Sequence, residues 1–293
     1  MVVDMKRTLW LAWVLLLLSL SLSTARSGIP DNNINYAVLL EFENGCQASG
    51  FVLMAEDRLF LITARHVLRD ASGHLRGNIL FLTTREPNGP KTTFSRIRVN
   101  LADLEASGQV LFSASHDAAA TAIGRVQGIG ERRQVNYVPQ VKLVSGRGIT
   151  ALDLRNTVSS EALRVTAEVY VSGYPNSLGV DGRRPWNAQI PLVRRGCIAG
   201  LNAESRLIIL DCRVDRGNSG GPVILQTASA TGDILYRVIG LVSEWVPQAD
   251  QWVNPGLNQV NLEVSNSGYS TVVPMEVVYE LVAASVAVPM VNR

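Results

Sequence analysis

The stretch DCRVDRGNSGGPV (residues 211–223) places one serine, Ser219, among three glycines and a proline. Glycine reaches backbone conformations that other residues avoid, so this composition predicts a tight turn that leads into the following apolar segment. Such a turn can expose a serine as a nucleophile, or contain one as an ordinary polar residue. A serine hydroxyl is a poor nucleophile unless a neighbouring base, usually oriented by a carboxylate, takes its proton. The histidines of the chain therefore decide between the two interpretations.

The chain contains three histidines, in different surroundings. His66 follows the apolar segment FLITAR, and an imidazole at the end of a buried strand is held firmly while it faces a cleft. His74 lies among turn residues, which favours a solvated side chain. His116 precedes Asp117, which opens the small apolar segment AAATAI. A carboxylate at the start of a buried strand is costly unless it is paired, which suits Asp117 as the partner of a histidine.

The order of these residues along the chain bears on the class of hydrolase. GNSGG matches the G-x-S-x-G pattern of α/β-hydrolases, in which the acid and the histidine follow the serine. No histidine follows Ser219, so that interpretation fails on the sequence itself. The subtilisin order of acid, histidine and serine would need an acid before His66 in a matching motif. Asp57 is available there, but its surroundings do not support the role.

Short segments rich in valine, isoleucine and leucine recur along the chain, separated by glycine, proline, asparagine and aspartate. Many short strands at such spacing are typical of an all-β sandwich or barrel. The stretch from about residue 125 to 161, with QGIGERRQ and SGRG, has the composition of a connection between two β halves. Pro274 followed by MEVVYELVAASV predicts a C-terminal helix, since proline fits the first helical turn.

Three motifs together resemble those of the trypsin-like serine peptidases. TARHV, HDAAATAI and DCRVDRGNSGGPV occur in that family's order, and the last is similar to the form in HtrA-type and other bacterial-style members. YRVIGLVSEW is similar to the strand that lines the family's substrate cleft. The resemblance covers about residues 36–283. Three motifs in the right order are far more specific than any one of them.

The resemblance implies an all-β fold of two six-stranded antiparallel β-barrels with a C-terminal helix. Residues 26–140 would form the first barrel, with His66 and Asp117, and residues 141–293 the second, with Ser219 and the helix. It also implies a serine endopeptidase. The serine would attack a peptide carbonyl and form an acyl-enzyme, the histidine would accept and return the proton, and the aspartate would hold the imidazole.

Neighbouring residues acquire roles from the same resemblance. The backbone N–H groups of Gly217 and Ser219 would form an oxyanion hole. Ser243, Glu244 and Trp245 would line the substrate cleft.

Two further positions bear on specificity and activation. Arg213 lies six residues before the serine, where many relatives carry the base of the primary specificity pocket. A cation there would favour acidic side chains, and the alternative is an arginine that points into water. Mammalian trypsin-like enzymes carry an aspartate immediately before the serine, which captures a freed amino terminus. Asn218 in that position predicts an enzyme without this activation switch. HtrA enzymes usually continue into a PDZ domain, which we do not expect here.

The amino terminus predicts export. Lys6 and Arg7 precede an apolar run over residues 9–18, and the small residue Ala25 suits the end of a signal peptide. The run is shorter than the roughly 20 residues of a membrane-spanning helix, which favours cleavage over a retained anchor. We therefore expect residues 1–25 to be a signal peptide, and the protein to be secreted or periplasmic without stable membrane association.

Export makes the cysteines informative, because disulfides persist in oxidising compartments. Cys197 and Cys212 lie in two apolar segments that the intervening LNAES predicts to form a β-hairpin. A turn centred between Glu204 and Ser205 would place the two cysteines opposite each other, at a distance compatible with a disulfide. Two small buried thiols are the alternative. Cys46 would remain unpaired.

Composition limits the partners. Charged residues make up 18% of the chain, and the net charge of +2 includes no long run of one sign, which argues against nucleic acid. No spacing of cysteine and histidine suggests a metal site, and we expect no cofactor. Protein or peptide substrates are the expected partners. Two alternative functions remain open: a catalytically inactive homologue that binds proteins, and an esterase or acyltransferase that uses the same triad.

Overall fold

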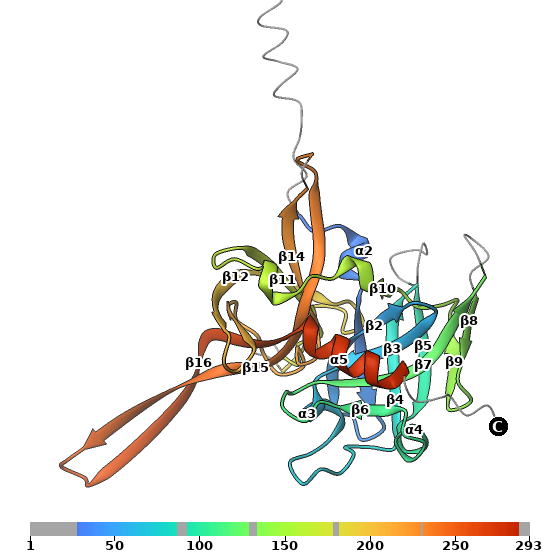
Figure 1. Cartoon of the computed structure of the whole chain (residues 1–293). Helices are drawn as coiled ribbons and strands as arrows, with labels where there is room; N and C mark the ends of the chain where they lie inside the picture. The colour runs from blue at the N-terminus through green and yellow to red at the C-terminus, as the bar shows by residue number, and fades with distance from the viewer. Residues whose placement is uncertain (1–27, 87–92, 129–133, 178–181, 230, 287–293) are drawn as a thin grey trace, which may run out of the picture. The chain divides into compact units, whose positions relative to one another are not determined.

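Two β-sheets, joined by a C-terminal helix, make up most of the chain in the computed structural model (Figure 1). The structure describes residues 28–86, 93–128, 134–177, 182–229 and 231–286. The predicted signal peptide lies outside these residues. Asp31–Arg293 form one compact unit, separate from Met1–Pro30. Within the described residues, no helix is long and apolar enough to cross a membrane.

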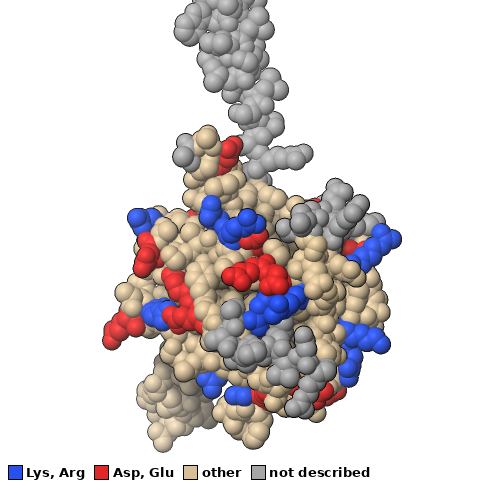
Figure 2. Space-filling model, turned by 45° about the vertical axis from the view of Figure 1, so that its right-hand side comes forward, with Lys and Arg blue, Asp and Glu red and all other residues tan. Residues whose placement is uncertain are grey.

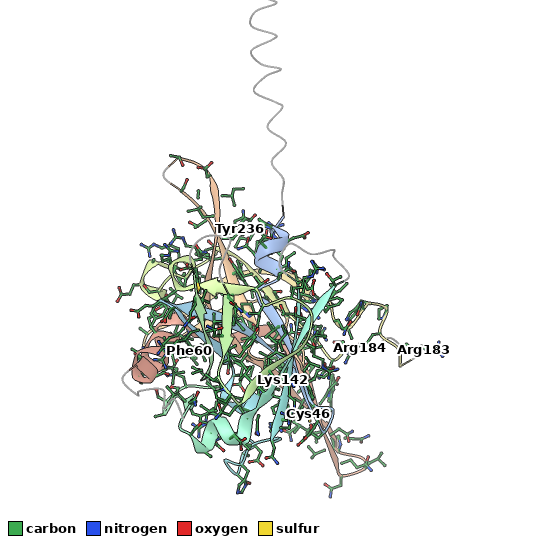
Figure 3. All side chains as sticks on the ribbon, turned by 90° about the vertical axis from the view of Figure 1, so that its right-hand side faces the viewer. Cys46, Phe60, Lys142, Arg183, Arg184 and Tyr236 are labelled. Carbon is green, nitrogen blue, oxygen red and sulfur yellow. The ribbon has the colours of Figure 1, made fainter. Side chains whose placement is uncertain are left out.

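The first sheet has the strand order β6-β7-β3-β2-β1-β4-β5-β9, with β8 beside β7 and β10 parallel to β2. Its strands are β1 (Ala37–Phe42), β2 (Gln47–Ala55), β3 (Arg58–Thr63), β4 (Ile79–Arg85), β5 (Phe94–Asn100), β6 (Val110–Phe112), β7 (Ala119–Gln127), β8 (Gln134–Tyr137), β9 (Val141–Ser145) and β10 (Ala151–Asp153). Alternation is clear in β5, where Ile97 and Val99 are buried and Arg96 and Arg98 are exposed. Phe60 in β3 is fully buried and lies inside the body of the molecule (Figure 3).

The second sheet closes into a barrel with the order β11-β12-β13-β16-β15-β14. Its strands are β11 (Glu168–Gly173), β12 (Leu192–Asn202), β13 (Leu207–Asp211), β14 (Pro222–Ala228), β15 (Ile234–Asn254) and β16 (Gln259–Pro274). The fully buried side chains that fill it include Val169, Ile198, Leu210, Val223 and Val272. The barrel core is therefore aliphatic and closed.

Short helices connect and cover the two sheets. They are α2 (Asp31–Ile34), α3 (Arg65–Leu68), α4 (Leu101–Ala106), the 3₁₀ turns η2 (Leu154–Asn156) and η3 (Ser160–Ala162), and the terminal α5 (Met275–Val286). The predicted C-terminal helix is confirmed as α5, which packs against β6 and β7 of the first sheet and β15 of the second. Arg58 of β3 donates a hydrogen bond to the carbonyl of Ser285 in α5 at 3.0 Å. The helix thus fastens one sheet to the other.

The all-β fold class with two β halves is confirmed. The second half is the predicted six-stranded barrel, whereas the first is a curled sheet of ten strands. The stretch predicted to connect the halves contributes β8, β9 and β10 to the first sheet. The first sheet therefore runs past residue 140, where the sequence places the boundary. Alternating polar residues in β8 and β9 hide these strands, because they lie at the exposed margin of the sheet.

The hairpin of β12 and β13 has its turn where the sequence predicts it, since Asn202 pairs with Leu207. A β-bulge in β12 then shifts the register by one residue, and Cys197 pairs with Asp211. The predicted opposition of Cys197 and Cys212 is therefore wrong, because one extra residue in a strand changes every later pair. All three cysteines of the chain are free thiols in the structure.

β15 and β16 continue beyond the barrel as a two-stranded ribbon that projects from the body (Figure 1). Residues 247–254 of β15 pair with residues 259–266 of β16. We call residues 247–266 the arm. Two register shifts, between Val242 and Glu244 and between Trp245 and Pro247, separate the arm from the barrel.

Candidate active site

Ser219 lies in a turn whose backbone requires glycine at two positions, one before and one after the serine. Gly217 and Gly220 have φ angles of 96° and 83°, in the left-handed region. A Cβ atom on Gly217 would lie 2.3 Å from the carbonyl oxygen of Tyr174, and one on Gly220 would lie 2.2 Å from Thr63 Oγ1. Both side-chain positions are filled by other atoms. The glycines of the serine motif are therefore required by conformation and by space.

The first sheet anchors this turn through Ser49, a fully buried residue of β2. Its N–H donates to the carbonyl of Ser219 at 3.1 Å. Its hydroxyl donates to the carbonyl of Gly217 at 2.6 Å and accepts from the N–H of Tyr174 at 2.8 Å. Its carbonyl accepts from Thr63 Oγ1 at 2.8 Å. One residue of the first sheet thus fixes the serine turn of the second through its backbone and its side chain.

The sequence contains one signal for Ser49. A serine inside the apolar strand QASGFVLMA must find hydrogen-bond partners when the strand is buried. It belongs to no catalytic motif, so motif searching does not find it.

His66 and Asp117 meet because β3 and β7 are neighbours. Thr63, at the end of β3, pairs with Ala119, at the start of β7, and the two side chains extend from these ends. His66 Nδ1 lies 2.7 Å from Asp117 Oδ2, and the backbone N–H of His66 donates to Asp117 Oδ1 at 2.9 Å. The imidazole is 46% exposed and the carboxylate 27% exposed. Both carboxylate oxygens therefore hold the same histidine.

A third donor reaches the carboxylate from the second barrel. Ser243 Oγ donates to Asp117 Oδ2 at 2.7 Å. Burial is the largest single effect on the pKa of Asp117 and raises it. The hydrogen bonds and the charge of His66, together with the hydrogen bond from Ser243, lower the pKa and outweigh the effect of burial. The net pKa of Asp117 is below its usual value of 3.8. Asp117 is therefore ionised at neutral pH.

One cleft between the two sheets contains these groups, with a volume of about 740 Å³. The predicted site residues among its lining are His66, Asp117, Gly217, Ser219, Ser243, Glu244 and Trp245. Among the hydrogen bonds of the described residues, those of His66 run to Asp117 and Arg76, and none joins it to the Ser219 hydroxyl. The structure thus brings the three motif residues into one cleft, with the histidine and the aspartate in direct contact.

Arg213 does not lie with them. Its side chain is 62% exposed, and its Nε lies 3.4 Å from Asp215 Oδ1. It contributes to a neighbouring pocket with Trp186 and Arg194 rather than to the cleft. This location does not fit the base of a specificity pocket, because Asp215 holds the guanidinium outside.

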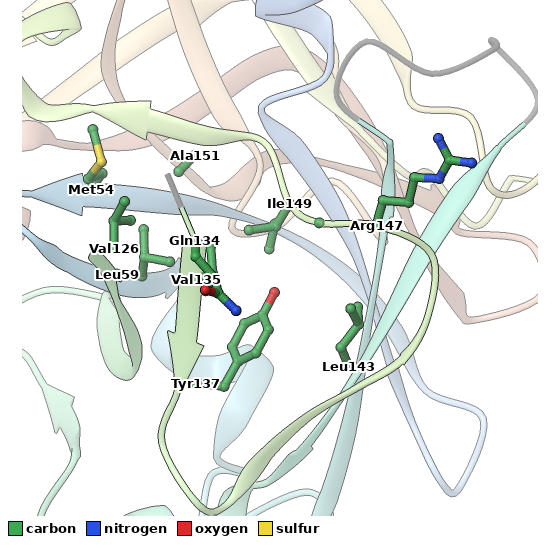
Figure 4. Close-up of a pocket in the computed structure, with 11 residues that line it drawn as sticks. Met54, Leu59, Val126, Gln134, Val135, Tyr137, Leu143, Arg147, Ile149 and Ala151 are labelled. Carbon is green, nitrogen blue, oxygen red and sulfur yellow. The ribbon is translucent and has the colours of Figure 1, made fainter. Parts of the chain in front are cut away.

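Another pocket lies within the first sheet, away from these residues (Figure 4). It has a volume of about 500 Å³ and is lined mainly by aliphatic side chains. The hydroxyl of Tyr137 is buried there without a hydrogen-bond partner among the described residues, and burial raises its pKa to about 12. Within the same described ranges, no group of His, Cys, Asp and Glu side chains is arranged to hold a metal ion.

The family model of the trypsin-like peptidase domain matches residues 48–232, which include His66, Asp117 and Ser219. The chain belongs to the trypsin-like peptidase family. A search of curated protein sequences finds no match to this trypsin-like peptidase.

Solved structures similar to this trypsin-like peptidase come from proteases. The crystal structure of Deg5 is 15% identical with a TM-score of 0.46, and the match covers 85% of this chain and 88% of Deg5. A serine-to-alanine variant of the HtrA-type protease AlgW with a tripeptide is 15% identical with a TM-score of 0.43, and the match covers 86% of this chain and 60% of AlgW. The serine endoprotease from Yersinia pestis is 12% identical with a TM-score of 0.43, and the match covers 89% of this chain and 68% of the endoprotease.

Proposed function

We propose that this trypsin-like peptidase is an active serine endopeptidase whose triad is His66, Asp117 and Ser219. Ser219 Oγ attacks the carbonyl carbon of a peptide bond while His66 Nε2 accepts the hydroxyl proton. His66 then returns that proton to the leaving amine. Water next attacks the acyl carbonyl while His66 accepts its proton, and His66 gives that proton to Ser219 Oγ as the ester bond breaks. Asp117 remains ionised and stabilises the imidazolium that forms in each step.

The observation that carries this proposal is the two-point contact between His66 and Asp117. An ionised carboxylate only accepts hydrogen bonds, so the 2.7 Å contact requires the proton of a neutral imidazole to lie on Nδ1. Nε2 is then the acceptor nitrogen, as a general base needs. The backbone contact at 2.9 Å prevents the carboxylate from turning away. The hydrogen bond between nucleophile and base often closes only when substrate binds.

The glycine turn supports an oxyanion hole at Gly217 and Ser219. Removal of one such donor in a serine peptidase costs about 3–4 kcal/mol of transition-state stabilisation. Ser49 holds the carbonyl of Gly217 and the carbonyl of Ser219, which fixes the Gly217–Asn218 and Ser219–Gly220 peptide planes on either side of the plane that carries the Ser219 N–H. A turn held in this way offers its N–H groups without reorganisation when charge develops on the substrate oxygen.

We further propose that the enzyme acts outside the cytoplasm, and that removal of residues 1–25 completes its maturation. Asn218 is 1% exposed, and its Oδ1 has no hydrogen-bond partner among the described residues. A neutral amide at this position provides no charge to capture a new amino terminus. The chain that begins at residue 26 should therefore be active. Activity that appears only after a further cut would contradict this part of the proposal.

A fluorophosphonate probe and casein cleavage test the proposed chemistry on residues 26–293. The probe should label the wild type and Ser205→Ala, whose serine lies in an exposed turn, but not Ser219→Ala. His66→Ala should abolish casein cleavage, whereas His74→Ala, at an exposed position, should not. Absence of labelling in the wild type would leave a binding protein. Labelling without casein cleavage would indicate an esterase instead.

A further inference from the structure

The arm has one apolar and one polar face. In a two-stranded ribbon, alternate residues point to opposite sides, and directly paired residues point to the same side. The pairs Val253–Val260, Gln251–Leu262 and Ala249–Val264 therefore share one face. The large side chains among them are all strongly exposed: Val253 at 63%, Val260 at 61%, Leu262 at 67% and Val264 at 55%. We call this side the apolar face of the arm.

Exposed large hydrophobic side chains concentrate on this arm. Among the described residues, Val144, Val165, Leu201, Ile234 and Tyr269 lie elsewhere and apart, whereas six occur between residues 252 and 264. Four of the six lie on the apolar face, while Trp252 lies on the opposite face and Leu257 in the turn. Contiguous exposed apolar patches mark interaction sites, while scattered ones are ordinary. A two-stranded ribbon with nothing packed against it is also only marginally stable in water. Both considerations indicate that the apolar face has a partner.

Charge on the arm excludes two kinds of partner. The arm carries Asp250 and Glu263 but no lysine or arginine. Segments that lie on membranes use Lys and Arg on their polar face to attract anionic lipids, and nucleic acids are bound through the same residues. Figure 2 likewise shows basic and acidic side chains interspersed on one side of the molecule, with neither sign gathered into a single patch. The partner of the arm is therefore neither an anionic membrane nor a nucleic acid, and its contact surface is uncharged.

The apolar face itself is such a surface. It is uncharged, and two copies can pack face to face as sheets do in β-sandwiches. Asp250 and Glu263 form a direct pair on the opposite face, so they would remain in water in such an assembly. Two like charges side by side also prevent a third arm from stacking on that face. The arrangement closes at two copies rather than growing into a fibre.

We propose that the apolar face of the arm is a self-association surface, through which two copies of this chain form a dimer. The proposal does not depend on catalysis. The three pairs of this face span residues 249–253, which at about 3.3 Å per residue gives an apolar face about 17 Å long and roughly 10 Å wide. This is smaller than the roughly 800 Å² that each partner buries in a standard interface. The dimer should therefore be weak and dependent on concentration.

Sedimentation velocity of residues 26–293 over a wide concentration range tests this surface. Leu262→Asp places a charge on the apolar face, and Asn261→Asp places the same charge one residue away on the polar face. Because both copies carry the change, Leu262→Asp should raise the dissociation constant by roughly 30-fold or more. Asn261→Asp should leave it close to the wild-type value. Replacing residues 249–264 by an Asn-Gly turn, which joins Gln248 to Ser265, removes the apolar face altogether and should give a monomer.

Thermal unfolding establishes that each variant is folded before its association is compared. A wild-type dimer that Leu262→Asp weakens and Asn261→Asp preserves would support the proposal. A wild type that stays monomeric at every concentration would overturn it, as would equal effects of the two substitutions. Arm-dependent binding to phosphatidylcholine vesicles, without self-association, would also overturn it and would identify the arm as a lipid-binding element.

Discussion

Replacement of Ser49 by alanine should impair catalysis from a position outside the proposed triad. The hydroxyl makes two fully buried hydrogen bonds, one to the carbonyl of Gly217 at 2.6 Å and one from the N–H of Tyr174 at 2.8 Å. Alanine leaves both backbone groups buried without partners. Each such group costs about 1–3 kcal/mol, so the variant should lose about 2–6 kcal/mol of folding stability. For a chain of this size, a loss near the middle of that range lowers the Tm by roughly 10 °C.

The same substitution should lower kcat more than it changes KM. Without the Ser49 hydroxyl, the carbonyl of Gly217 has no donor to hold it, and the Gly217–Asn218 peptide next to the one that carries the Ser219 N–H is free to turn, although the backbone N–H of residue 49 still holds the carbonyl of Ser219. Loss of one oxyanion donor reduces kcat by about 10²–10³. The substituted residue lies behind the turn rather than in the cleft, so ground-state binding should change little. Steady-state kinetics on a peptide ester, below the Tm of the variant, measures both parameters.

Ser95→Ala is the matched control for this effect. Ser95 is fully buried in the first sheet, and its hydroxyl accepts hydrogen bonds from the N–H groups of Arg147 and Gly148, each at 3.1 Å. Its loss should destabilise the fold, by less than the loss of the Ser49 hydroxyl because these hydrogen bonds are only partly buried, without a change in kcat. If Ser49→Ala keeps the wild-type kcat, or if both variants lose kcat equally, the positioning role of Ser49 is refuted.

Three further outcomes follow from the structure. Asp117→Asn should reduce kcat by on the order of 10⁴ in peptide hydrolysis, because an amide does not fix the histidine tautomer. Since the pKa of Asp117 is lowered in the folded state, its stabilising contribution is full above about pH 4 and is lost as the pH falls through the lowered pKa. Urea titrations across acidic pH should therefore show a larger loss of folding stability for the wild type than for Asp117→Asn. Gly220→Ala should lower the Tm more than Gly232→Ala. The two glycines have similar φ angles of 83° and 87°, but only a Cβ on Gly220 meets another atom, Thr63 Oγ1 at 2.2 Å. Equal losses of Tm would contradict this crowding. Iodoacetamide at neutral pH should modify the exposed Cys46 and spare Cys212, whose pKa burial raises to about 11; mass spectrometry of early Cys212 adducts would contradict its burial.

The cleft residues could be predicted from sequence because the chemistry limits the choice. With three histidines in the chain and none after Ser219, few arrangements of base, acid and nucleophile were open. The motif order then led to two β halves and a cleft between them. Ser243 was predicted to line that cleft, but its hydrogen bond to Asp117 depends on how the second barrel sits against the first. Contacts of this kind connect distant parts of the chain and leave no pattern in local sequence.

Predictions that depended on counting residues along a strand were less successful. The β12–β13 turn was correctly placed, yet a single bulge separated Cys197 from Cys212 in the register. The stretch that contains β9 is interpreted as a connection because it is polar and rich in glycine, and Val144 of β9 is exposed. Periodicity identifies strands that have one buried face. It does not identify strands at the margin of a sheet, or the positions where an extra residue enters.

The bulges in β15 show how much such an extra residue can determine. A bulge bends a strand and increases its twist, and it directs one side chain away from the regular alternation. The first shift lies at Ser243, between Val242 and Glu244, and the hydroxyl at that position reaches Asp117. The second follows Trp245, where β15 leaves the barrel and becomes the arm. Two irregularities within a few residues therefore provide both a donor for the carboxylate and the departure of an apolar ribbon. Because β15 forms the cleft wall and the arm in one continuous strand, a partner held on the arm would restrain the strand that carries Ser243.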